Sequence, residues 1–434
     1  MKYDCSFAKI NIMLLFAVLI LSSCIEKIKI SISPRVVEFE ANPVEALTIN
    51  VSANVEWTAT IRQEEKWLSI EPLQGTGNAT ITITAVENGI FDTRKAYIVI
   101  SGEGVKSDSI RVEQFASIDV AEQIEDENFR NYCLKVYDNA PQDGKISLRE
   151  AMNVREMIVK SLEIKSLVGL EYFSRIYKLN CSDNEIKNID FSKNKEIKIL
   201  DCSFNPLDQI NFGELDKLVD LTVYDAGLTS IDVSKNKTLE WLAISNNKIT
   251  SIDVSNNLEL RGLECNYNNL SRLDVSKNTK LQTLYCVNAQ LRELDVSRNL
   301  DLVYLWCGNN QIATLNVSQN ANLQSLSCSN NGIANLNLSN NKKLVDLVCD
   351  RNLLTTLDVS QNTLLRNIRC SGRIDDNGNP IGKLTGNIDV SSNILLREFD
   401  FQNNPLLAII YVWQGFDKEN PYYRKDGATK FEEK

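Results

Sequence analysis

The sequence contains no histidine among its 434 residues. Histidine is the most common general base and metal ligand in proteins, and it activates the nucleophile of many serine and cysteine hydrolases. Its absence removes those catalytic arrangements. The 57 acidic residues are spread over repeat positions and turns, without an obvious pair of the kind that glycosidases use. The sequence therefore predicts a protein that is not an enzyme and has no catalytic residues.

The chain also lacks any excess of positive charge. Its formal net charge is -10, its pI is about 5.0, and no element carries a stripe of lysine and arginine. A chain of this charge repels the phosphate backbone of DNA and RNA. We therefore expect no nucleic-acid partner.

The N-terminus carries a short apolar run. Lys2 and Lys9 precede the run at 10–21, which is too short and too close to the start for an ordinary membrane span. Positive charge followed by such a run is typical of an export signal. We therefore expect an exported protein.

The end of this run resembles the bacterial lipobox, since residues 21–24 read Leu-Ser-Ser-Cys. The resemblance implies a signal peptide at 1–23, cleavage before Cys24, lipid on the Cys24 sulfur and a tether over 24–30. A plain signal peptide that ends in cysteine, or a signal anchor, is the alternative. The expected location is the cell envelope, with a lipid anchor in the outer membrane, on either the surface or the periplasmic side.

A repeat of 21 residues, without insertion or deletion over nine intervals, dominates the second half of the chain. The marker positions are Cys181, Cys202, Val223, Ile244, Cys265, Cys286, Cys307, Cys328, Cys349 and Cys370, and after a ten-residue insertion Phe401 follows. A period this strict predicts a solenoid of stacked, nearly identical coils.

Eight of the eleven cysteines occupy this one position. Val223 and Ile244 replace cysteine in sister repeats, so the position should face the interior. Parallel Cβ directions give poor disulfide geometry, and a straight column cannot surround a tetrahedral metal ion. We expect a column of buried, reduced thiols and no bound metal. The asparagine three residues after each marker, and the Asp-Val-Ser-x-Asn corner, should likewise be structural.

Residues 31–117 alternate between apolar and polar side chains in short runs separated by turns, which predicts a small β-sandwich. Its landmarks, among them Trp57, the Trp67-Leu68-Ser69 triplet, Asn88 and Arg94, resemble the BACON domain of Bacteroidetes proteins. That resemblance implies either carbohydrate or mucin binding or a spacer role. Buried tryptophans are common in sandwich cores, so we expect Trp57 and Trp67 to be structural.

Residues 118–164 change to helical spacing, at 122–136 and 148–159, with an acidic loop between the two segments. The second half of that loop fits an EF-hand, with Asp143 before a glycine and Glu150 at the last ligand position. The first half does not fit, because Pro141 falls on a ligand position. We expect a helix-loop-helix cap with no bound cofactor, and calcium at Asp143 and Glu150 is the alternative.

From about 165 to 434 the repeat reads L-x-x-L-x-C-x-x-N-x-L-x-x-L-D-V-S-x-N-x-x, which resembles leucine-rich repeat proteins, above all internalin-like ones of the internalin J type. The resemblance implies parallel strands along a concave face that recognises proteins or other surface ligands without catalysis. The insertion within 373–386 should form a small hairpin. A last strand is expected at 409–413, with the charged tail covering the final coil.

Strand alternation turns the residues beside each inward Leu and Cys toward the concave face. Several of these positions are aromatic, and exposed aromatic clusters mark interaction sites. The candidate ligand-binding residues are Tyr224, Trp241, Tyr267, Tyr285, Tyr304 and Trp306. Flanking acids, such as Asp201, Asp220 and Glu264, favour a cationic or hydrogen-donating ligand. In the alternative, the aromatic side chains pack on one another and only shield the sheet.

The sequence therefore predicts a multidomain protein, with a small all-β sandwich, a helical cap and a right-handed parallel β solenoid of leucine-rich repeats. The predicted function is non-enzymatic binding of a protein or other macromolecule on the concave face of a lipoprotein, in adhesion. The alternative is a surface glycan-binding lipoprotein that captures polysaccharide or mucin.

Overall fold

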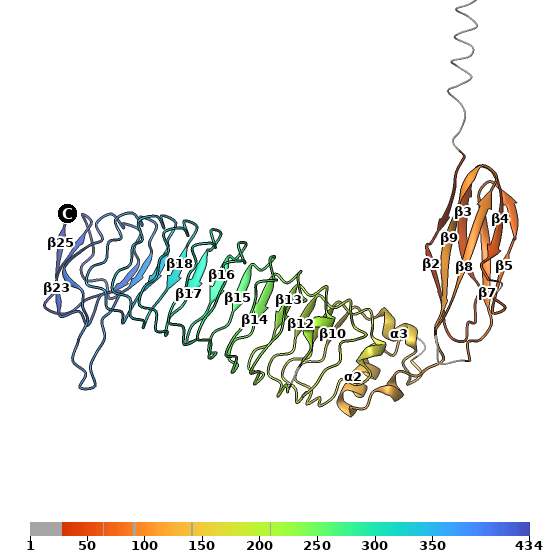
Figure 1. Ribbon diagram of the computed structural model, residues 1–434, viewed down its shortest axis with the longest axis horizontal. Coiled ribbons are helices and arrows are strands. Elements are labelled where there is room, and N and C mark those ends of the chain that lie inside the picture. Colours follow the sequence, from red (N-terminus) through yellow and green to blue (C-terminus); the bar gives the residue numbers. More distant parts are fainter. Residues whose placement is uncertain (1–27, 64, 90–92, 140–141, 209) are drawn as a thin grey trace, which may run out of the picture. The chain divides into compact units, whose positions relative to one another are not determined.

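The computed structural model describes residues 28–434 except 64, 90–92, 140–141 and 209 (Figure 1). The export signal and Cys24 lie outside the described residues. The chain forms two compact units that divide near Asp119, with residues 147–149 grouped with the first. Within the described part of the chain, no helix has the length and apolar character of a membrane span.

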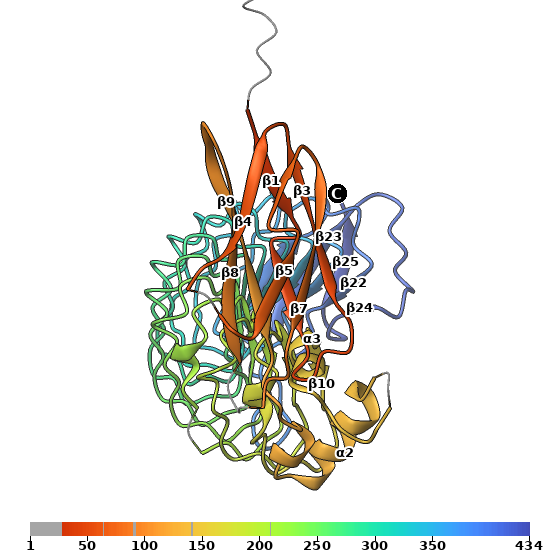
Figure 2. The same cartoon turned by 90° about the vertical axis from the view of Figure 1, so that its right-hand side faces the viewer.

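The first unit is a β-sandwich of two sheets, drawn in red and orange in Figure 2. Alternating residues of both sheets, Ile49, Ile81, Ile98 and Val112 among them, form one buried core. One sheet orders its strands as β1 (Ile30–Ser33), β3 (Leu47–Ala53), β7 (Ala79–Ala85) and β5 (Leu68–Glu71). The other orders them as β2 (Val36–Phe39), β9 (Val105–Gln114), β8 (Arg94–Gly102), β4 (Glu56–Ile61) and β6 (Gln74–Thr76). The predicted all-β N-terminal region is confirmed.

The second unit begins with a short 3-10 turn (Ala121–Gln123) and two helices, α2 (Glu127–Tyr137) and α3 (Leu148–Asn153). Asp126 caps α2, because its carboxylate accepts a hydrogen bond from the Phe129 amide at 3.0 Å. The Phe129 ring packs on Phe173 of the following coil, with centroids 6.3 Å apart. Helix α2 therefore packs against the first coil.

The second helical segment is shorter than the sequence pattern predicted. It ends at Asn153, and residues 156–158 form β10 (Glu156–Ile158), which pairs in parallel with β11 (Lys178–Asn180). Met157 lies opposite Leu179 and is buried. Pairing with β11 and burial of Met157 thus outweigh the local helical spacing at 156–158. The solenoid therefore begins inside the segment that the sequence assigned to the cap.

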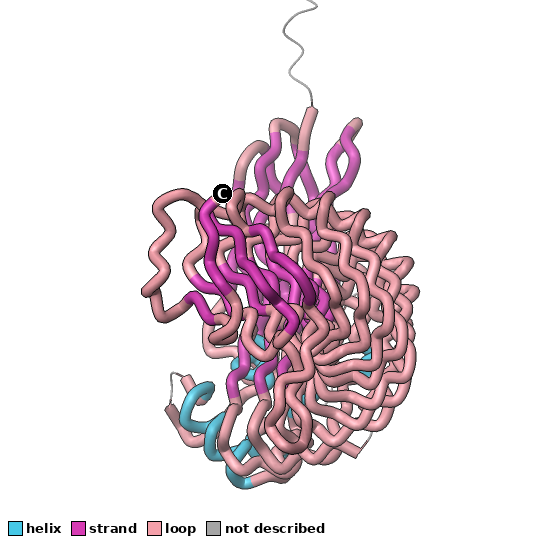
Figure 3. The backbone as a smooth tube through the Cα atoms, turned by 90° about the vertical axis from the view of Figure 1, so that its left-hand side faces the viewer, coloured by secondary structure: helices cyan, strands magenta, loops and turns pink. Residues whose placement is uncertain are grey.

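The solenoid has one parallel sheet of thirteen short strands among the described residues (Figure 1). After β10 and β11 its strands are β12 (Ile199–Asp201), β13 (Asp220–Thr222), β14 (Trp241–Ala243), β15 (Gly262–Glu264), β16 (Thr283–Tyr285), β17 (Tyr304–Trp306), β18 (Ser325–Ser327), β19 (Asp346–Val348), β20 (Asn367–Arg369), β22 (Glu398–Asp400) and β24 (Tyr423–Arg424). Between consecutive strands up to β20 the chain runs through turns and loops, with one 3-10 turn at Leu170–Tyr172 and another at Phe212–Glu214 (Figure 3). The predicted leucine-rich repeat solenoid is confirmed.

The cysteine column lies in the solenoid interior, as predicted. Its eight thiols, together with that of Cys133 in α2, are free and buried. Burial raises the pKa of the Cys181, Cys265 and Cys307 thiols to about 12. Almost no thiolate therefore forms at neutral pH.

We expect the folded protein to resist thiol reagents. With iodoacetamide at pH 8, the column thiols should react at least ~100-fold more slowly than in denaturant, because only thiolate attacks and these sulfurs are out of reach. Peptide mass spectrometry of the labelled chain measures this site by site. Rapid labelling of Cys286 or Cys307 in the folded protein would contradict the placement of the column.

Two asparagine columns hold the coils together. In the first, Asn247 donates to the carbonyls of Val223 and Ile244 and accepts from the amides of Ala226 and Leu228. In the second, which ends each Asp-Val-Ser-x-Asn corner, Asn257 donates to the carbonyls of Val233 and Asn236. These buried amides pair with backbone groups of neighbouring coils, so the asparagines have the structural role that their recurrence predicts.

The last coils are closed by aromatic side chains and a second small sheet. That sheet has three parallel strands, β21 (Thr385–Asp389), β23 (Leu406–Val412) and β25 (Lys430–Glu433). The expected strand at 409–413 is thus part of β23, but it is not the last, because the charged tail forms β24 and β25. The insertion makes a short antiparallel turn in which Ile374 pairs with Pro380.

Candidate ligand-binding face

The sheet of the solenoid presents the first and third residue of each strand outward. We call this surface the sheet face. On β17 the central Leu305 is fully buried, whereas Tyr304 and Trp306 on either side are each 40% exposed. On every three-residue strand of the stack the central residue is buried, whereas several flanking residues, such as Ala243 and Thr283, are themselves covered by their neighbours. The flanking residues that stay exposed or half-buried are those that a ligand would meet.

Four aromatic residues gather on the sheet face over β14 to β17, and we call them the aromatic patch: Trp241, Tyr285, Tyr304 and Trp306. The rings of Tyr285 and Trp306 stack on neighbouring strands, with centroids 4.4 Å apart and planes inclined by 19°. The Trp306 indole also donates to the Ser325 hydroxyl at 3.2 Å. The Tyr285 and Trp306 rings are therefore held in place before any ligand arrives, which lowers the entropy cost of binding.

Trp241 owes its position to a glycine. Its ring lies against Gly262 on the adjacent strand, and a Cβ atom there would come within 2.1 Å of the indole. Any other residue at 262 would displace the ring. Nothing in the spacing of the repeat marks this glycine, so sequence reasoning missed it.

The two other candidate residues lie outside the strands. Tyr224 follows β13, and its hydroxyl donates a hydrogen bond to Glu264, two strands away. Burial and this bond raise the pKa of Tyr224, which keeps the phenol protonated. Tyr267 lies in the turn after β15 with a φ of 52°, and it is 54% exposed. The structure thus places Tyr224 beside the patch and Tyr267 in a turn apart from it.

Three carboxylates lie on the same face: Asp220 and Glu264 stand opposite the patch residues Trp241 and Tyr285, and Asp201 lies one strand farther out. Burial raises the pKa of Asp220, and the negative charges of Asp201 and Glu264 add to the rise. The same acids also raise the pKa of Tyr224. The face over β12 to β15 is therefore strongly negative next to an aromatic surface.

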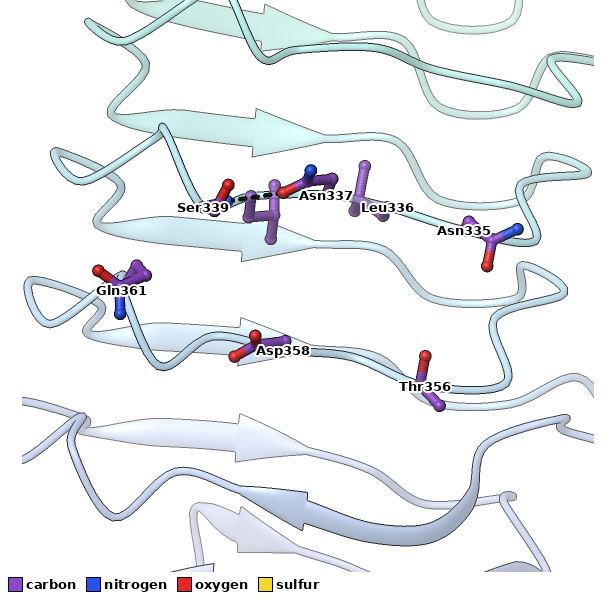
Figure 4. A pocket seen from close by; sticks show the side chains of 8 residues that line it. Asn335, Leu336, Asn337, Ser339, Thr356, Asp358 and Gln361 are labelled. Carbon is purple, nitrogen blue, oxygen red and sulfur yellow. Dashed lines mark hydrogen bonds between the residues drawn. The ribbon is translucent and has the colours of Figure 1, made fainter.

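A shallow groove on another side of the solenoid is less distinctive (Figure 4). Asn337, Thr356, Asp358 and Gln361 line it with polar groups from two neighbouring coils. Its one internal hydrogen bond, from the Ser339 amide to Asn337, repeats at the corner of most coils. The groove is thus a product of the repeat, with no feature of its own.

The acidic loop of the cap uses its carboxylates for internal bonds. Glu150 accepts from the Asn139 amide at 2.8 Å, Asp143 from the Lys145 amide at 3.0 Å, and Asp138 from the Gly144 amide at 2.9 Å. In the described residues, no group of three or more acidic or cysteine side chains has the arrangement of a metal site. Backbone amides thus occupy oxygens that a calcium ion would need.

From this geometry we expect that calcium does not stabilise the protein. The thermal midpoint should be the same, within about 1 °C, in calcium and in chelator, since a ligand shifts stability only when it binds the folded state. Differential scanning fluorimetry measures it, and the Asp143→Asn/Glu150→Gln variant is the control. A midpoint that rises with calcium in the wild type and not in this variant would establish the EF-hand alternative.

The tryptophans of the sandwich are buried, as expected. Trp57 is 2% and Trp67 is 7% exposed. The Trp57 indole donates to the Gly77 carbonyl at 2.9 Å, and the Arg94 guanidinium lies 4.7 Å from the centre of the Trp67 ring. Neither ring is free to stack on a sugar.

The fold and the sheet face define a leucine-rich repeat solenoid joined to a β-sandwich, an architecture that suggests a protein-binding or adhesion-type function. The family model described as "Viral BACON domain" matches residues 29–117. InlJ of Listeria monocytogenes, whose functional domain includes a cysteine ladder, is 26% identical with a TM-score of 0.58, over 72% of this chain and 71% of that one.

Two further solved structures share the fold. The internalin InlF of Listeria monocytogenes is 17% identical with a TM-score of 0.60, over 73% of this chain and 98% of that one. The leucine-rich repeat protein LIC12759 of Leptospira interrogans is 18% identical with a TM-score of 0.55, over 65% and 74%. No curated protein matches the chain. These three structures are described as internalins or as a leucine-rich repeat protein.

Proposed function

We infer that this protein is a non-enzymatic lipoprotein of the cell envelope that binds a protein ligand on the sheet face of its solenoid, in adhesion. The observation that carries the proposal is the aromatic patch, because Tyr304 and Trp306 stay exposed although Tyr285 and Trp306 stack. Aromatic rings that only shielded the sheet would be covered by one another. Tyrosine and tryptophan are also the residues that most often dominate protein interfaces.

The envelope location rests on the N-terminal sequence. Basic residues before a short apolar run, and the lipobox-like end at Cys24, support export and a lipid anchor in the outer membrane. The sandwich would then separate the anchor from the solenoid, and the burial of its tryptophans supports a spacer role over sugar binding.

Binding of residues 25–434 to an array of matrix proteins and of mucin and plant glycans tests the proposal. The wild type should bind a protein, and the Tyr285→Ala/Trp306→Ala variant should bind it at least ~100-fold more weakly, since two aromatic hot spots are worth about 2 kcal/mol or more each. Alanine fits at this position, because Ala243 occupies it on β14.

The matched control is the Tyr97→Ala/Tyr422→Ala variant, which removes two exposed tyrosines outside the sheet face. It should bind like the wild type. If the wild type and the Tyr285→Ala/Trp306→Ala variant both bind to glycans on the array, the alternative of a polysaccharide-capturing lipoprotein is supported instead. Protein binding that both variants retain would place the binding site elsewhere.

A further inference from the structure

Charge is distributed unevenly on the sheet face. Three of the seven carboxylates at outward strand positions pair with a base: Glu156 with Lys178 at 3.4 Å, Glu398 with Arg424 at 3.8 Å, and Asp400 with Arg424 at 2.9 Å. Glu240, just before β14, pairs with Arg261 at 3.2 Å. Asp350, just after β19, pairs with Arg369 at 3.5 Å. Bases thus neutralise the strand acids toward both ends of the sheet, on β10 and β22.

Asp201, Asp220 and Glu264 differ from the acids on β10 and β22, since none of them forms an ion pair within the described structure. Asp201 accepts from the Asn180 amide group and the Ser203 backbone, and Glu264 accepts from the Tyr224 hydroxyl. The twelve outward positions of β12 to β17 hold these three acids and no base. Asp346, on β19, is the other strand acid without a base and accepts from Asn367.

Leaving like charges together costs free energy in the free protein, and a cationic ligand would recover it. Asp220 shows the cost, because burial and the two neighbouring acids raise its pKa. Lys198 precedes β12, but it is exposed and forms no ion pair in the described structure. The three acids therefore lack a basic partner among the described residues.

The acids adjoin the aromatic patch in a regular order. Along the third strand position the residues run Asp201, Thr222, Ala243, Glu264, Tyr285 and Trp306 on consecutive strands. Five strand spacings cover about 24 Å, which an extended peptide of about seven residues spans. Between the two acids in this row lie Thr222, which is half-buried, and Ala243, which is buried.

We propose that the sheet face binds an extended protein segment that places an arginine or lysine over Asp201, Asp220 and Glu264 and an apolar side chain over the Tyr285–Trp306 stack. This inference rests on the proposed function and specifies its ligand. The aromatic rings supply contact area, whereas the acids select a basic partner, since electrostatic complementarity governs specificity. A guanidinium beside Trp241 also gains from the ring face.

The probe is a random heptapeptide library on phage, selected on immobilised residues 25–434. Enriched peptides should carry arginine or lysine with an apolar neighbour. The best one is then synthesised with arginine at its basic position or with citrulline there, which has nearly the shape of arginine without its charge. Citrulline should weaken binding to the wild type at least ~10-fold, and binding of the basic peptide should weaken with added salt.

The protein variant is Asp201→Asn/Asp220→Asn/Glu264→Gln. We expect it to keep the fold, because other coils carry asparagine at the same strand positions: Asn180 at that of Asp201 and Asn367 at that of Asp220. A glutamine at 264 can still accept the hydrogen bond from Tyr224. This variant should bind the basic and citrulline peptides about equally. The control variant is Asp232→Asn/Asp253→Asn/Asp274→Asn, which changes the net charge by the same amount. These residues accept a backbone hydrogen bond at the corners of their coils, as Asn316 and Asn337 do in other coils. The control should bind both peptides like the wild type.

The outcomes separate this inference from the proposed function. Peptides without a base, or equal binding of both peptides by the wild type, would overturn the basic ligand, as would a library with no enriched peptide. If binding of a protein on the array is nevertheless lost in the Tyr285→Ala/Trp306→Ala variant, the proposed function stands, but the inference of a basic ligand does not. If that variant also binds fully, both fail.

Discussion

Replacing Phe399 by alanine should destabilise the C-terminal end of the solenoid by roughly 3–5 kcal/mol, the usual cost of removing a buried phenylalanine. Phe399 is fully buried, and four other rings surround it at the last coil. The centroid distances are 4.7 Å to Tyr423, 5.4 Å to Phe401, 6.0 Å to Phe431 and 6.1 Å to Phe416.

This cluster closes the final coil. A solenoid transmits stability only between neighbours, so an open end frays inward. The substitution should therefore increase hydrogen exchange in β22 to β25 first, while β11 to β14 keep their protection. The control Tyr422→Ala removes a side chain that is 63% exposed and should change little. Uniform loss of protection along the stack would contradict a local cap.

Replacing Asn247 by alanine should cost roughly 2–4 kcal/mol, because buried backbone groups lose their partners. The Asn247 amide bonds to Val223 at 2.8 Å and to Ile244 at 3.0 Å, and its oxygen accepts two amides. Each backbone group left without a partner would cost about 1–3 kcal/mol. The expected total is smaller than the sum for the four groups, because the turn can change its conformation and restore some of these hydrogen bonds.

The chain itself shows how the turn relaxes. Ala226 and Ala289 replace asparagine at this position in two coils, and the next residues, Gly227 and Gln290, have φ values of 73° and 62°. The variant would need Lys248 in this left-handed conformation, at a cost of about 1–2 kcal/mol. Urea unfolding measures the loss. The exposed Asn256→Ala, whose side chain forms no hydrogen bond in the described structure, is the control, and an equal effect of both variants would contradict the structural role of the column.

Strict periodicity explains what the sequence predicted well. Every 21 residues the same position must fill the same interior site, so the cysteine column, the asparagine columns and the strands could be read from the repeat. The burial of Trp57 and Trp67 was expected because tryptophans are common in the cores of β-sandwiches. These features depend on local pattern and on contacts between neighbours.

Contacts that depend on one particular coil could not be predicted. The ring of Trp241 can lie against the adjacent strand only because residue 262 is glycine. The Tyr224 hydroxyl bonds to Glu264, two strands away. The helical spacing of the α3 sequence continues through residues 156–158. These residues nevertheless form strand β10, because they pair with β11. The charged sequence of β25 gave no strand signal, and only its pairing with β23 makes it one.

The central claim is that the ligand binds on the sheet face of the solenoid. Oxidative footprinting of residues 25–434, with and without the protein captured on the array, tests it directly by mass spectrometry. We predict that Tyr304 and Trp306 become protected in the complex, whereas Tyr97 and Tyr422 react as before. Protection confined to residues 29–117, with Trp306 still reactive, would contradict the account.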